Sequence, residues 1–92
     1  MARIEIQSEE ESGRGWVYRA AVEHAGQRTQ HAVTLAWVDH DRWSGGRVPP
    51  STVIEALIGF VLEQGRAIPE RFDAATVRRW FPDVDRELAG RF

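Results

Sequence analysis

The group Asp39-His40-Asp41 has the residue types that acid–base or metal-assisted chemistry would need. An imidazole lies between two carboxylates at the end of a predicted strand. These side chains could serve as general acids and bases, or as ligands of a hydrolytic metal ion. In an extended backbone, alternate side chains point to opposite sides, so His40 would face away from both aspartates. A joint catalytic site therefore requires the backbone to bend here.

Two histidines, His24 and His31, are the candidate metal ligands. The predicted hairpin puts both on one face of a sheet as diagonal neighbours, where two imidazoles could share a transition metal. Zinc needs at least one further protein ligand, and the nearest carboxylate, Glu23, points to the other face. The sequence therefore predicts two polar residues at the end of a hairpin, with no metal site and no cofactor.

The segment Ser44-Gly45-Gly46 precedes a predicted helix, a position where backbone N–H groups often hold phosphate. Pro49 and Pro50 remove two of the donors that such a cradle would use. Neither the Walker pattern nor the dinucleotide-binding glycine pattern is present. Ser44 also lacks the Gly-x-Ser-x-Gly context of a nucleophile. The segment is interpreted as a tight turn.

The same loop has the composition of a contact surface. Trp43 is flanked by Arg42 and Arg47, and both residue types are enriched at the hot spots of protein interfaces. A tryptophan is costly to leave in water unless it closes the core beneath its own loop. We therefore predict partner binding by Arg42, Trp43 and Arg47, with core closure as the alternative role of Trp43.

Arg78 and Arg79, beside Trp80, are the candidate nucleic-acid contacts. Residues 66–92 hold six arginines against five acidic residues, which is too balanced for a strong phosphate footprint. The connection before this segment is also longer than the turn of a helix-turn-helix motif. The sequence favours a solvated helix face for the two arginines.

The composition is that of a single globular domain covering residues 1–92. Hydrophobic residues make up 42% and charged residues 28% of the chain, and there are no cysteines, which excludes disulfides and thiolate chemistry. The formal net charge of −2 argues against a broad electrostatic grip on nucleic acid. All twelve basic residues are arginine, a bias typical of GC-rich bacterial genomes. No signal peptide or membrane span is recognisable, so we expect a cytoplasmic protein.

Three segments have the alternation of strands. Residues 2–7 alternate Ile4 and Ile6 with polar residues, and the acidic and glycine-rich residues up to Gly15 predict an exposed connection. Two longer alternating segments form a predicted hairpin over residues 16–38.

The hairpin register follows from its turn. A two-residue turn at Gly26-Gln27 places glycine at the first central position, as a type II′ turn prefers. This register pairs Trp16 with Trp37 and Tyr18 with Leu35, so that the apolar side chains of both strands share one face. A slip of one residue would separate them.

Residues 52–64 form a predicted helix. Thr52 and Glu55 fit a capping box, and Gly65 provides a left-handed stop. Apolar residues cover roughly two-thirds of the helix circumference, whereas one packing surface needs a stripe of about 100°. We therefore expect this helix to be covered on two sides, by the sheet and by either the C-terminal helices or a second subunit.

Two short helices complete the chain. Asp73 caps a helix over residues 74–81, Pro82 interrupts it, and a last helix covers residues 83–89. The predicted fold is α+β, with a three-stranded antiparallel sheet in the order β-β-β-α-α and the long helix packed on the sheet. The neighbour of the first strand is left open.

These features favour a small non-catalytic bacterial protein-interaction module. The wide apolar arc of the long helix and the two open edges of a three-stranded sheet favour a homodimer. One alternative is an antitoxin-like nucleic-acid-binding regulatory protein that uses Arg78 and Arg79. The second alternative is a small metal-dependent hydrolase built around Asp39-His40-Asp41.

Overall fold

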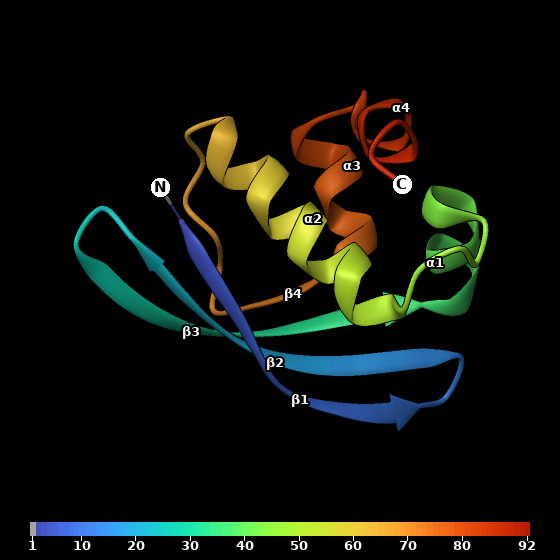
Figure 1. Cartoon of the computed structure of the whole chain (residues 1–92), viewed down its shortest axis with the longest axis horizontal. Coiled ribbons are helices and arrows are strands. Elements are labelled where there is room, and N and C mark those ends of the chain that lie inside the picture. The colour runs from blue at the N-terminus through green and yellow to red at the C-terminus, as the bar shows by residue number, and fades with distance from the viewer. Residues whose placement is uncertain (1) are drawn as a thin grey trace.

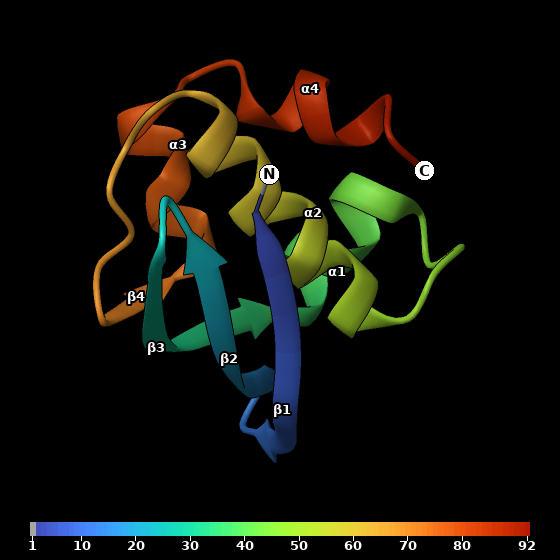
Figure 2. The same ribbon diagram turned by 60° about the vertical axis from the view of Figure 1, so that its left-hand side comes forward.

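The computed structural model describes residues 2–92 as an α+β fold, with helices on one face of a four-stranded sheet (Figure 1). The elements are β1 (Arg3–Ser12), β2 (Gly15–His24), β3 (Gln27–Ala36), α1 (Trp37–Ser44), α2 (Pro50–Glu63), β4 (Arg71–Asp73), the 3-10 helix η1 (Ala74–Thr76), α3 (Val77–Trp80) and α4 (Val84–Ala89). The strand order is β1-β2-β3-β4. A second view shows the helices on the same side of the sheet, so the opposite face stays open (Figure 2).

The fourth strand corrects the predicted three-stranded antiparallel sheet. β4 pairs in parallel with β3, so the sheet is mixed. The chain after α2 returns along β3, where the Ala32 N–H donates to the Glu70 carbonyl at 2.8 Å. β4 has only three residues, too few to show an alternating pattern in the sequence.

The first strand pairs with β2 and is longer than predicted. It continues through the glutamates at 9–11 to Ser12, so this acidic stretch is strand and not a connection. The register shifts between Ile6 and Ser8, an irregularity that resembles a β-bulge. Strand pairing requires only the backbone, and at the edge of the sheet the glutamate side chains stay exposed to water. Charged side chains are therefore compatible with this strand.

The β2–β3 hairpin uses a different turn from the predicted one. Its central residues are Ala25 and Gly26, with φ values of 54° and 78°, the left-handed pair typical of a type I′ turn. Trp16 consequently pairs with Leu35 and not with Trp37. The register differs by two residues from the prediction. Because side chains alternate with a period of two, the apolar rows still share one face.

α1 replaces the predicted end of the hairpin and the loop that follows it. The second strand of the hairpin, β3, was expected to continue to Val38, but it ends at Ala36, and α1 begins at the next residue. The inward side of the helix includes Asp39 and Trp43, both buried. Gly45 ends the helix with φ 64°, and its N–H donates to the Asp41 carbonyl. The inward face of α1 thus packs against α4 and α2, which are distant in the sequence.

α2 begins two residues earlier than predicted and has no capping box. Its first residue is Pro50 and its N-cap is Pro49, which makes no side-chain capping bond. Proline suits the first helical position because its missing N–H would have no partner there. Thr52 and Glu55 therefore lie inside the helix. Gly65 follows the helix end with φ 75°, as predicted.

α2 is covered on two sides by its own chain, as its wide apolar arc requires. It contacts β1 on one side and α4 on the other, and Figure 1 shows α3 and α4 beside it. The wide arc therefore no longer favours a dimer.

The predicted cap at Asp73 is confirmed, since Asp73 accepts a hydrogen bond from the Ala75 N–H at 2.9 Å. The largest fully buried side chains are Trp43, Tyr18, Leu35, Ile54, Leu57, Ile58, Leu88, Val33, Val53, Val61, Val77 and Val84.

Candidate functional site

A network of ion pairs joins α1, α3 and α4. Arg78 Nη2 lies 2.7 Å from Asp39 Oδ1, and Arg78 Nε lies 2.9 Å from Asp85 Oδ1. The Trp43 Nε1–H donates to the same Asp85 oxygen at 2.6 Å. The Arg78 guanidinium carbon is 5.0 Å from the centre of the Trp43 ring, within cation–π range. The network fixes α1 against the C-terminal helices.

The charges of this network stabilise one another. Burial alone would raise the pKa of Asp85, but hydrogen bonds from Trp43 and Arg78 outweigh it, and the pKa lies below its ordinary value. Burial alone would lower the pKa of Arg78, but the carboxylates of Asp39 and Asp85 outweigh it, and the pKa of Arg78 lies above its ordinary value. Asp39 is 4% exposed, so Arg78 provides the counter-charge that it needs.

The structure does not bring Asp39, His40 and Asp41 together. Asp39 points inward to Arg78, whereas Asp41 is exposed. His40 Nε2 lies 2.7 Å from the Val48 carbonyl oxygen, and the His40 ring packs edge-on against the Trp16 ring. Successive helical residues point about 100° apart, which separates the three side chains. We therefore base no catalytic proposal on them.

The two candidate metal ligands lie in different surroundings. His31 is buried, and both of its ring nitrogens have partners at 2.7 Å, the Thr29 hydroxyl and the Pro69 carbonyl. His24 is exposed and lies opposite Gln27 at the turn. Within residues 2–92, no group of three or more histidine or acidic side chains is arranged to hold a metal ion.

The glycines after α1 serve its C-terminus. Gly45 and Gly46 have φ values of 64° and 74°, which only glycine adopts readily. The Ser44 hydroxyl donates to the His40 carbonyl at 2.8 Å. These bonds end one helix, and the proline N-cap of the next provides no N–H for an anion.

The three predicted partner-binding residues border one hollow at the C-terminal end of α1. Arg42, Trp43 and Arg47 line an open depression of about 230 Å³. Arg42 and Arg47 are exposed, whereas Trp43 is 1% exposed. Trp43 therefore closes the core, the alternative role considered for it, and forms part of the wall of the hollow. The other lining residues are Asp41, Ser44, Gly45, Ala89 and Phe92.

Sequence reasoning missed the exposed large apolar side chains at the other end of α1. Trp37 and Val38, in the first turn of α1, are 51% and 61% exposed. They were predicted to lie at the end of a strand, where Trp37 would face Trp16. The signal that was available is the position of two large apolar residues directly before a charged segment.

Arg78 and Arg79 do not form a common surface. Arg78 is paired with Asp39 and Asp85, while Arg79, the next residue of the short helix α3, is exposed. A phosphate would have to compete with two carboxylates for Arg78.

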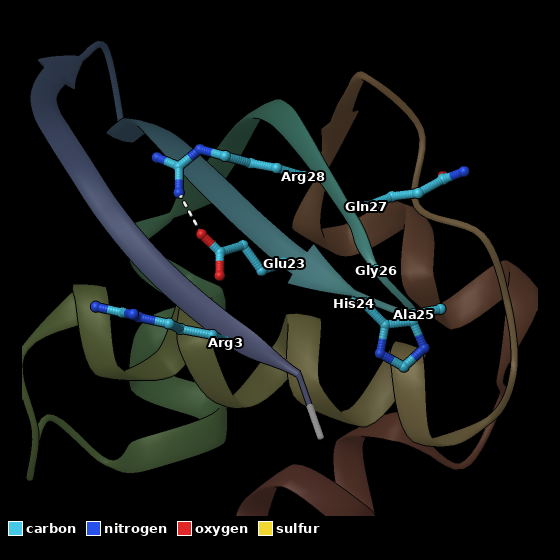
Figure 3. A pocket seen from close by; sticks show the side chains of 7 residues that line it. All are labelled: Arg3, Glu23, His24, Ala25, Gly26, Gln27 and Arg28. Carbon is cyan, nitrogen blue, oxygen red and sulfur yellow. Dashed lines mark hydrogen bonds and ion pairs between the residues drawn. The ribbon is translucent and has the colours of Figure 1, made fainter.

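A second hollow, of about 360 Å³, lies at the tip of the β2–β3 hairpin. Figure 3 shows that its side chains splay apart and do not converge on one point. Glu23 is bonded to Arg28 at 2.7 Å, and Arg3, His24 and Gln27 point in different directions. This hollow therefore does not present a convergent set of polar groups.

Comparison with protein-family models, with curated proteins and with solved structures finds no match to this chain. None of the helices within residues 2–92 combines the length and the apolar character needed to cross a lipid bilayer.

Proposed function

We propose that this protein is a non-catalytic, cytoplasmic protein-interaction module, and that the hollow at the end of α1 binds its partner. The observation that carries the proposal is the arrangement of Arg42, Arg47 and Phe92 around one open depression. Two guanidinium groups, an aromatic ring and the carboxylate of Asp41 are suited to binding a large amphipathic side chain.

The electrostatics of the hollow also support this role. Arg42 and Arg47 have no ion-pair partner within 4.0 Å among the described residues, whereas Arg28, Arg78, Arg86 and Arg91 are paired. No carboxylate within residues 2–92 holds the guanidinium groups of Arg42 and Arg47 in place, and the charge of Arg42 acts within the fold only at longer range, where it helps to lower the pKa of Asp85. Both guanidinium groups remain able to contact another molecule, and arginine is a frequent hot-spot residue.

The test compares two variants of the full chain that lose the same charge. Arg42→Ser/Arg47→Ser removes the two arginines of the hollow, and Arg79→Ser/Arg86→Ser removes two exposed arginines elsewhere. Each variant is expressed and crosslinked in the cells in which the natural chain occurs. We expect the yield of partner protein crosslinked to the first variant to fall at least about tenfold relative to the wild-type chain. The second variant should keep it. Equal yields from both variants would reject the assignment of the site.

The two alternative functions make different predictions. A nucleic-acid-binding protein that uses Arg78 and Arg79 would bind mixed DNA or RNA with an affinity that falls steeply with salt. A hydrolase based on Asp39, His40 and Asp41 would require Asp39 to leave Arg78. Both are less well supported, because Arg78 and Asp39 already neutralise each other inside the protein.

A further inference from the structure

The outward face of α1 carries an apolar projection at one end and the hollow at the other. Trp37 and Val38 project from the first turn, and Asp41 and Arg42 follow one turn later at the rim of the hollow. Because residues four apart share a helix face, these four side chains form one continuous surface. The inward face, with Asp39 and Trp43, is buried.

We infer that the partner is a second copy of this chain, with the outward faces of two α1 helices packed antiparallel. This inference rests on the proposed function and names the occupant of the same hollow. In this arrangement, the first turn of each helix meets the last turn of the other. Trp37 of each copy is thereby brought to the hollow of the opposite copy, and one two-fold axis forms both contacts.

The chemistry of the two ends is complementary. An indole needs an acceptor for its N–H and favours a cation over its ring face. The hollow provides the Asp41 carboxylate as the acceptor, Arg42 and Arg47 as cations, and Phe92 as an aromatic wall.

The charges of the helix distinguish this arrangement from a parallel one. Two parallel α1 helices would place Asp41 against Asp41 and Arg42 against Arg42, which is repulsive. Antiparallel packing instead brings the charged end of each helix to the apolar end of the other. The outward face of α1 is therefore complementary to itself in one direction only.

The size of the surface sets the expected strength. α1 has only 8 residues, so a contact centred on it buries less than the roughly 800 Å² per partner of a standard interface. We expect a dissociation constant in the micromolar range and a monomer–dimer equilibrium in solution.

The experiment is sedimentation equilibrium of the full chain from about 1 µM to 1 mM, a range that brackets micromolar association. Trp37→Ala should weaken the dimer at least about 30-fold, the loss typical of a hot-spot tryptophan. Ala89→Arg, which fills the hollow beside Arg42 and Arg47, should do the same. Arg79→Ser is the control and should leave the dissociation constant unchanged. Circular dichroism checks that each variant is folded.

Mixing the two weakened variants gives a sharper test. Trp37→Ala keeps an intact hollow, and Ala89→Arg keeps an intact tryptophan, so a mixture can form one of the two contacts. We expect a heterodimer weaker than the wild-type dimer but stronger than either variant alone.

Two results would overturn the inference. A wild-type dimer that Trp37→Ala leaves intact would place the contact elsewhere. A wild-type chain that stays monomeric to 1 mM would exclude the second copy as partner, and the proposed function would stand if Arg42 and Arg47 were still needed to capture another protein. If those arginines were also dispensable, the proposed function would fail with it.

Discussion

Replacing Arg78 by methionine should destabilise the protein strongly. The substitution keeps the apolar stem of the side chain but removes the charge that neutralises Asp39, whose side chain is 6% exposed. Breaking a buried ion pair by removing one partner costs about 3–5 kcal/mol. Because the Arg78 side chain is itself 25% exposed, water can approach the vacated space, and we expect the lower end, about 3 kcal/mol.

The other partner of Arg78 adds little to this value. The Asp85 side chain is 41% exposed and keeps its hydrogen bond from Trp43, so losing the ion pair costs at most about 1 kcal/mol. Small domains are stable by about 5–15 kcal/mol. For a domain of this size, a loss of 3 kcal/mol lowers the melting temperature by roughly 12–24 °C.

The assay is urea unfolding followed by tryptophan fluorescence, with Arg78→Met compared to Asp39→Asn/Arg78→Met. The second variant also removes the carboxylate that Arg78→Met leaves buried without a counter-charge. It should therefore be more stable than Arg78→Met alone. A loss below about 1 kcal/mol for Arg78→Met, or a double variant less stable than the single one, would refute this reasoning.

Three further outcomes are expected. Ala25→Asn should raise the free energy of unfolding by about 0.5–1 kcal/mol in urea titrations, because asparagine accepts the left-handed φ of 54° more readily than alanine. Gly15→Ala should lower the free energy of unfolding by about 1–3 kcal/mol, because the added Cβ would clash with the Leu35 carbonyl oxygen. Calorimetry should show this as a lower thermal midpoint. Burial and the hydrogen bond to Glu9 raise the pKa of Tyr18, so ultraviolet titration of this single tyrosine should show no phenolate near pH 10 while the chain is folded. The raised pKa stabilises the folded state below about pH 10, and this stabilisation is lost as the pH rises further.

The faces of the sheet could be predicted from the sequence, but the register could not. Alternation of apolar side chains places Trp16 and Leu35 on the core face in both the predicted and the observed hairpin. A shift of two residues preserves this pattern, so the pattern cannot distinguish a turn at Gly26-Gln27 from one at Ala25-Gly26. The choice lies in the backbone angles of Ala25, an uncommon left-handed alanine.

The residues of the proposed site were singled out by type, but their arrangement was not predicted. Arg42 and Arg47 were predicted to contact a partner because of their residue type, and the structure places both at one hollow, whereas their contact with a partner stays a prediction. The helical state of α1 was missed, and its inward face makes contacts with distant residues, among them the pair of Asp39 with Arg78, 39 positions away. No local pattern records that pairing. Without the helix, the exposure of Trp37 could not be predicted.

The outer edge of β1 bears on how this chain behaves when concentrated. β1 is an edge strand, and its glutamates at 9–11 are exposed along it. Fibrils grow when identical strands stack in register, and each added copy would then place its glutamates directly beside the same glutamates of the preceding copy. Such stacking is repulsive, so the edge opposes endless growth. The proposed contact through α1 would close on itself after two copies, so a dimer formed in this way would not extend into a polymer.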